Sequence, residues 1–178
     1  MTAEPAAGAD ALQRRWPKGG LLAVAGLLIV IAWPVRAFVA EPFAIPSESM
    51  APTLRPGDHV LVDKLSYRLG NPTRGDLVVF RAPGDRAIAV KRIVGLAGDR
   101  VGIADGVLTV NGHLQRESFV DYPLMDSVYF GPVVVPAGDV FVLGDNRADS
   151  RDSRDYGAVP RRSLIGRVLT TLWPLIRL

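Results

Sequence analysis

The residues best suited to chemistry are serines in two segments and a lysine between them. The serines lie in residues 46–50 (Pro-Ser-Glu-Ser-Met) and 144–154 (Gly-Asp-Asn-Arg-Ala-Asp-Ser-Arg-Asp-Ser-Arg), and the lysine lies in residues 90–99 (Val-Lys-Arg-Ile-Val-Gly-Leu-Ala-Gly-Asp). A serine hydroxyl is a weak nucleophile at its ordinary pKa and becomes effective beside a general base. The three segments therefore predict a serine nucleophile that is activated by another side chain.

Few residues of this chain can serve as that base. The two histidines, His59 and His113, do not lie in a context typical of catalysis. Arginine stays protonated, and most of the basic residues are arginines. Of the three lysines, Lys18 precedes an apolar run and Lys64 ends a strand-like segment beside a turn, where we expect it to be solvated. Lys91 is the remaining candidate.

Lys91 lies in a strand-like run, residues 87–94, between two glycines. Period 2 places Ala87, Ala89, Lys91 and Ile93 on one face. An ammonium group among small and apolar side chains is desolvated, which lowers its pKa toward the range where a neutral amine accepts protons. Such a lysine can also be an ordinary surface residue of an edge strand, but its place between the serine segments favours the general base.

Ser49 is the predicted nucleophile. Pro46, Pro52 and Pro56 fix φ around it and disfavour a regular helix, which predicts a stiff loop. A stiff loop can hold a hydroxyl near its base. Taken alone, the segment favours a hydroxyl-capped turn, and its place before the lysine segment favours the nucleophile.

The order of these motifs resembles that of the bacterial type I signal peptidases, membrane-bound Ser/Lys proteases that remove signal peptides from exported preproteins. The resemblance runs from about Arg36 to Trp173. It implies cleavage after small residues of the Ala-x-Ala type, through an acyl-enzyme on Ser49 with Lys91 as general base. It also implies an oxyanion hole formed by the Ser47 hydroxyl and the Ser49 backbone N–H.

The resemblance assigns supporting roles to the third segment. Ser150 matches the serine that orients the lysine amine. Asp145, Arg147, Asp152 and Arg154 are expected to form a structural ion-pair network that positions the base, although alternating charges are equally typical of a solvated loop. The implied substrate-binding residues form a shallow apolar wall: Phe43, Ile45, Pro46, Met50, Leu54 and Ala89. A small pocket of this kind excludes bulky side chains by overpacking.

Two residues depart from the family pattern. Glu48 stands between the serines where Gly is common, and Ala97 replaces the proline of Leu-Pro-Gly-Asp. A Glu48 carboxylate pointing inward would raise the pKa of Lys91, whereas one pointing outward would be solvated. Neither change removes a reacting group.

An apolar run precedes the serine segment. Residues 19–35 are uncharged, and the run extends to residue 40 if Arg36 snorkels to the membrane interface. About 20 apolar residues span a bilayer as a helix. We therefore expect residues 19–40 to be a transmembrane anchor, 1–18 a disordered cytoplasmic tail and 41–178 an extracytoplasmic catalytic domain. A cleaved signal peptide and a buried core helix are the alternatives.

The basic residues before the run, Arg14, Arg15 and Lys18, orient the anchor with its N-terminus in the cytoplasm. The expected location is the bacterial cytoplasmic (inner) membrane, with a single pass and the catalytic domain on the outer face. The expected partners are signal-peptide-bearing preproteins, membrane lipids and, as a further candidate, the export machinery. The net charge of +3 is too small for a nucleic-acid partner. The sequence shows no metal-binding cluster, and we expect no cofactor.

After residue 57 the sequence predicts a mainly β fold, an antiparallel and partly closed β-sheet domain. Asp105-Gly106 and Asn111-Gly112 are signals for two-residue hairpin turns. The C-terminal residues 169–178 could form a last strand whose Trp173 rests at the membrane interface, or could pack in the core. The expected strands are residues 58–63, 76–80, 87–94, 101–104, 107–110, 113–115, 133–135, 140–143 and 166–172.

Other functions remain open from the sequence. A conjugation-type maturation peptidase and a self-cleaving repressor share the Ser/Lys arrangement, but the repressor class requires a DNA-binding domain that is absent from this sequence. From a different class, a membrane-tethered β-rich binding module could use the same serines and lysine structurally. Cleavage of a preprotein by the wild type but not by Ser49→Ala distinguishes an enzyme from a binding module.

Overall fold

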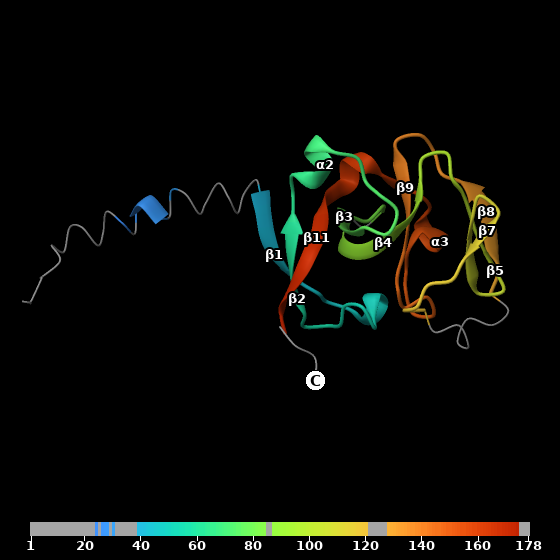
Figure 1. The fold of residues 1–178 in the computed structure, drawn as a ribbon, viewed down its shortest axis with the longest axis horizontal. Coiled ribbons are helices and arrows are strands. Elements are labelled where there is room, and N and C mark those ends of the chain that lie inside the picture. The colour runs from blue at the N-terminus through green and yellow to red at the C-terminus, as the bar shows by residue number, and fades with distance from the viewer. Residues whose placement is uncertain are drawn as a thin grey trace, which may run out of the picture.

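The computed structural model describes residues 24, 26–28, 30, 39–84, 87–120 and 128–174. In this part of the chain eleven strands form two antiparallel sheets, joined by four short helical segments (Figure 1). The strands are β1 (Ala40–Ala44), β2 (His59–Asp63), β3 (Leu77–Arg81), β4 (Ile88–Leu96), β5 (Arg100–Ala104), β6 (Val107–Val110), β7 (His113–Gln115), β8 (Phe130–Val134), β9 (Asp139–Leu143), β10 (Val159–Pro160) and β11 (Leu164–Trp173). The helical segments are η2 (Glu48–Met50), α2 (Ser66–Leu69), α3 (Ser153–Tyr156) and η4 (Arg161–Ser163).

The larger sheet has seven strands in the order β1-β2-β11-β3-β4-β9-β10, and the smaller has four in the order β7-β6-β5-β8. Strand β11 joins the two halves of the larger sheet, because it pairs with β3 near Leu164 and with β2 up to Trp173. Its register shifts along both pairings, and such bulges bend a strand. The larger sheet is therefore curled, and the prediction of a mainly β, antiparallel domain is confirmed.

The two predicted hairpins of the smaller sheet are confirmed. Asp105 and Gly106 connect β5 to β6 with φ values of 50° and 73°. Asn111 and Gly112 connect β6 to β7 with φ values of 53° and 82°. Positive φ at both central residues matches the twist of the flanking strands.

Strands β1 and β10 were not among the expected strands. Both lie at an edge of the larger sheet, and each contains a proline, Pro42 or Pro160. Proline has no N–H to donate, so it is tolerated at an edge where only one side of the strand is paired. Ala40, which we had expected to end the apolar run, instead begins β1.

The predicted anchor lies mostly outside the described residues. Within it, Val24, residues 26–28 and Val30 are helical with exposed apolar side chains, and Val39 and Ala40 are described where β1 begins. Over the described ranges, the structure contains no helix with the length and apolar character needed to cross a membrane.

Candidate active site

Ser49 lies in η2, within the loop that connects β1 to β2. The two ends of this loop are tied together, because the Ile45 N–H donates to the Asp58 carbonyl at 2.8 Å and the Gly57 N–H donates to the Ile45 carbonyl at 3.0 Å. Met50, the residue after the serine, is buried in the core. The loop is therefore anchored from below while Ser49 remains partly exposed.

Lys91 lies in β4, paired with Val78 of β3 and buried to 4% exposure. Its Nζ is 2.5 Å from Ser49 Oγ. Burial lowers the pKa of Lys91 and outweighs the opposing charge of Asp152, which favours the ammonium form. A lysine amine with a lowered pKa, within hydrogen-bond distance of a serine hydroxyl, can accept the hydroxyl proton.

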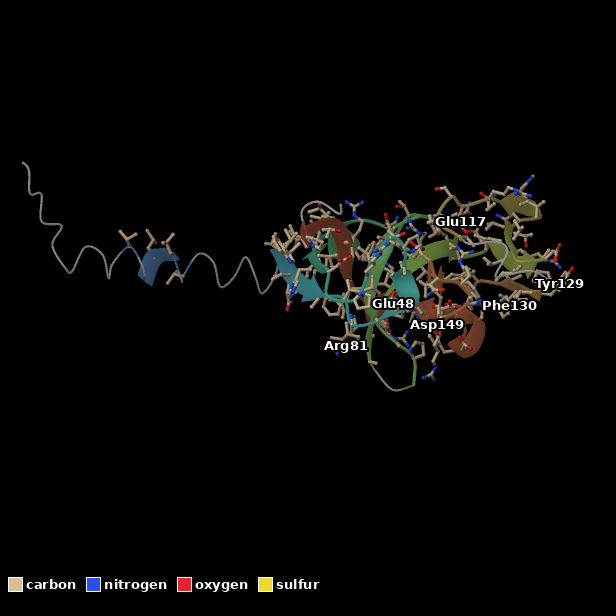
Figure 2. The ribbon with its side chains drawn as sticks, turned by 90° about the horizontal axis from the view of Figure 1, so that it is seen from below. Glu48, Arg81, Glu117, Tyr129, Phe130 and Asp149 are labelled. Atoms are coloured by element: carbon tan, nitrogen blue, oxygen red, sulfur yellow. The ribbon has the colours of Figure 1, made fainter. Side chains whose placement is uncertain are left out.

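Ser47 precedes η2, and its hydroxyl lies 3.2 Å from Ser49 Oγ. The side chain is exposed, so a carbonyl group approaching Ser49 from solvent meets both hydroxyls. Glu48 between them is also exposed, which places its carboxylate on the solvated side of the loop (Figure 2).

The segment from residue 144 to 154, here called the motif loop, follows β9 and packs against the serine loop. The Asn146 N–H donates to the Ser49 carbonyl at 3.2 Å, and the Asn146 side-chain amide donates to the Glu48 carbonyl at 3.4 Å. A Cβ atom on Gly144 would lie 2.5 Å from the Ser49 carbonyl oxygen. Glycine is therefore required for this close approach, and the motif loop fixes the backbone of the nucleophile.

One ion pair of the motif loop links it to the strand that bears the lysine. Asp145 is buried and accepts two hydrogen bonds from the Arg92 guanidinium, at 2.8 and 2.6 Å. The guanidinium also lies over the ring of Phe119, 4.3 Å from its centroid. Because Arg92 follows Lys91 directly, this pair ties the base to the motif loop.

A second ion pair closes the motif loop on itself. Asp152 is fully buried and accepts from the Arg154 guanidinium with both oxygens, each at 2.9 Å. It also caps α3 and accepts from the Gly144 N–H at 3.0 Å. Arg147 is buried and donates to the Gly144 carbonyl at 2.9 Å and to the Glu117 carboxylate. These contacts form a buried network and not a solvated loop.

Sequence reasoning missed Arg92, Asn146, Glu117 and Phe119 as parts of this arrangement. Arg92 lies in the lysine segment, residues 90–99, and Asn146 in residues 144–154, so their positions in the sequence could have indicated a place near the site. Glu117 and Phe119 lie in a stretch without clear periodicity, and only the fold brings Glu117 to the motif loop and Phe119 to Arg92.

Ser150 differs from the expectation drawn from the resemblance. Its hydroxyl oxygen is buried and has no hydrogen-bond partner among the described residues. The hydrogen bond to the lysine amine is therefore not formed in this structure, because the amine is directed at Ser49 Oγ.

The six residues assigned to substrate binding are divided between core and surface. Ile45, Met50 and Leu54 are 1–3% exposed and belong to one core cluster, so they support the serine loop from beneath. Phe43 and Ala89 are partly exposed, and Pro46 is exposed. Of the six, only these last three are accessible to solvent.

The family model and two related proteins that match this chain all belong to the signal peptidases. The family model described as "Signal peptidase, peptidase S26" matches residues 19–173. Signal peptidase I of Leptolyngbya laminosa is 41% identical over 161 residues, covering 86% of this chain and 78% of that protein. Signal peptidase I of Mycobacterium tuberculosis is 35% identical over 209 residues, covering 85% and 71%.

A solved structure of a signal peptidase I from Enterococcus faecalis V583 matches with a TM-score of 0.50 and 33% identity. It covers 56% of this chain and 97% of that one. The chain therefore belongs to the signal peptidase family, peptidase S26, and is a serine endopeptidase.

Proposed function

We propose that this protein removes signal peptides from exported preproteins by acyl transfer through Ser49, with Lys91 as the general base. The observation that supports this most strongly is the 2.5 Å separation of Lys91 Nζ and Ser49 Oγ around a buried amine. Family membership supports the substrate class. No observation favours the conjugation-type peptidase or a non-catalytic binding module.

The reaction begins with a neutral Lys91 amine. The amine takes the proton of Ser49 as Oγ attacks the scissile carbonyl carbon, and the ammonium then returns that proton to the leaving amine. The product of this half-reaction is an ester between Ser49 and the signal peptide. A water molecule then gives a proton to the same amine as it attacks the ester carbonyl, and the ammonium returns that proton to Ser49 Oγ as the peptide is released.

The Ser47 hydroxyl and the Ser49 backbone N–H stabilise the oxyanion in this proposal. The 3.2 Å contact between the two hydroxyls supports the role of Ser47, because both face the space where the carbonyl must lie. Ser150 orients the amine once Lys91 releases Ser49. Its buried hydroxyl, unpaired among the described residues, supports that role because a buried polar group gains from a hydrogen bond.

Specificity for small residues at the −1 and −3 positions of the signal peptide follows from the surface beside the serine. The partly exposed Phe43 and Ala89 each lie on a packed floor, because Phe43 packs against the core cluster of Ile45 and Met50 and Ala89 packs against the core cluster of Val78 and Ile93. A packed floor cannot move aside for a bulky side chain, so large residues are excluded more strongly than small ones are selected.

The proposed location is the bacterial cytoplasmic membrane, with residues 19–40 as a single-pass anchor and the catalytic domain on the outer face. The length of the apolar run supports the anchor. Leu169, Leu172 and Trp173 of β11 are exposed, as expected for a strand end that touches lipid. Membrane lipids and the export machinery are the further proposed partners.

The test is incubation of the full chain in detergent with a preprotein that carries an Ala-x-Ala site, compared with the Ser49→Ala variant. Mass spectrometry of the products is expected to show one cut after the −1 alanine for the wild type and none for the variant. Cleavage by the variant, or wild-type products cut elsewhere, would contradict the proposal.

A further inference from the structure

A basic cavity lies away from the catalytic residues, where three separate segments of the chain meet. Its volume is about 650 Å³. Five of its nine lining residues are basic and none of the nine is acidic, although the whole chain has 18 acidic residues. The lining consists of Lys64, Tyr67, Arg68, Arg81, Arg161, Arg162, Ser163, Leu164 and Ile165.

The arginines of this basic cavity fall into two groups. The Arg161 guanidinium is held in place, because it donates to the Gly70 carbonyl at 2.6 Å and to Asn71 Oδ1 at 2.7 Å. Arg68, Arg81 and Arg162 are exposed, and their guanidinium groups have no ion-pair partner among the described residues. Figure 2 shows Arg81 at the outer edge of the domain. Several unpaired guanidinium groups around one cavity favour an anion, and their planar geometry suits phosphate.

The position of the basic cavity indicates where the phosphate comes from. Lys64 lines it, and the Lys64 N–H donates to the Val39 carbonyl at 2.9 Å while its amine pairs with Glu41 at 2.5 Å. The cavity therefore adjoins the start of β1, where the apolar run joins the domain. Figure 1 shows α2 and the start of β1 at the same end of the molecule.

We infer that the basic cavity binds the phosphate of an anionic phospholipid headgroup and thereby fixes the catalytic domain against the membrane. The inference rests on the proposed anchor at residues 19–40, which would bring the start of β1 to the headgroup layer. A basic residue near an anionic lipid surface strengthens binding by about 1 kcal/mol, or roughly fivefold. Removal of two of these arginines should therefore weaken lipid binding roughly 30-fold.

The experiment uses the full chain in uncharged detergent micelles. The sequence has no cysteine, so Leu69→Cys, next to Arg68 and 84% exposed, gives a single site for an environment-sensitive dye. The labelled protein is titrated with phosphatidylglycerol or phosphatidylcholine. The double variant Arg68→Gln/Arg162→Gln should raise the Kd for phosphatidylglycerol roughly 30-fold. The matched control Arg100→Gln/Arg116→Gln, which removes two exposed charges at the smaller sheet, should change it about twofold or less.

Equal affinity for the two lipids, or an unchanged Kd in the Arg68/Arg162 variant, would overturn the inference. Inorganic phosphate or an acidic peptide that binds as tightly as phosphatidylglycerol would also overturn the assignment to lipid. The ligand of the basic cavity would then be a free anion or a peptide. Cleavage of a short soluble peptide is measured on the same samples and should be unchanged in the Arg68/Arg162 variant. Peptide cleavage tests the proposed catalysis, and the titration tests lipid binding, so either can fail alone.

Discussion

The two proposed reacting groups come from regions of opposite character. Ser49 lies in a proline-rich loop and is partly exposed, after the exposed Ser47 and Glu48. Lys91 lies within a strand of the larger sheet at 4% exposure, and burial lowers its pKa. The two groups need different surroundings. A nucleophile must be accessible to the substrate, whereas a lysine base must be shielded from water so that its pKa is lowered. The motif loop contacts both the serine loop and β4. Across this junction Lys91 Nζ lies 2.5 Å from Ser49 Oγ.

The largest effect is expected when either reacting group is removed. Ser49→Ala, Lys91→Ala and Lys91→Arg should each lower kcat/KM on preprotein by on the order of 10⁴-fold or more, because nucleophile and base act as one unit. Arginine keeps the charge but cannot accept the proton. Circular dichroism is the control for folding. Turnover within about tenfold of the wild type in any folded variant would remove that residue from the mechanism.

The next largest effect is expected at the motif loop. Asp152→Ala should lower the free energy of unfolding by about 3–5 kcal/mol, because it leaves the Arg154 charge without its buried partner. Asp149→Ala is the matched control, since Asp149 is exposed, and should cost about 0.5 kcal/mol or less. Urea unfolding of both variants checks the difference. Equal stability of the two would mean that the network does not hold the loop.

A smaller effect is expected from a substitution of Ser47, in the exposed serine loop. Ser47→Ala should lower kcat by on the order of 10²–10³-fold with little change in KM, because an oxyanion donor acts in the transition state. Glu48→Gln, at an exposed neighbour, is the control and should leave kcat nearly unchanged. A Ser47→Ala variant whose KM rises while kcat is kept would indicate substrate binding instead.

The parts of the fold that the sequence predicted are those determined locally. Asp105-Gly106 and Asn111-Gly112 specify their hairpins because the turn itself demands positive φ. Lys91 was placed on a strand by the strand-like run of residues 87–94 between two glycines, and it lies in β4. These features require no knowledge of distant residues.

The parts that escaped prediction depend on distant contacts. Phe119 reaches Arg92, and Arg81 meets Arg161 at one cavity, only because the curled sheet brings these segments together. The burial of Met50 and Leu54 likewise depends on the strands beneath the serine loop. The resemblance to the family associated Met50 and Leu54 with the site, but it did not indicate that both are buried.

The smallest expected effect concerns stability. Lys91→Met should raise the free energy of unfolding by about 1 kcal/mol at neutral pH, because it removes a desolvated amine. Since the folded-state pKa of Lys91 is lowered, the unfolded chain binds more protons between that pKa and 10.5. Wild-type stability therefore rises with pH across this window, and the advantage of Lys91→Met shrinks. Urea unfolding at several pH values checks the trend, and an advantage that grows toward pH 10.5 would contradict it.

The most direct test of Lys91 as the general base is an NMR titration of its amine. The chain contains only three lysines, so a full-length sample labelled at the lysine side chains gives three signals, and Lys91→Met identifies the one that disappears. We expect this signal to titrate below 10.5, the ordinary lysine value, because the amine is buried beside Ser49. A midpoint at or above 10.5 would show that Lys91 stays protonated at neutral pH and would contradict its role as the base.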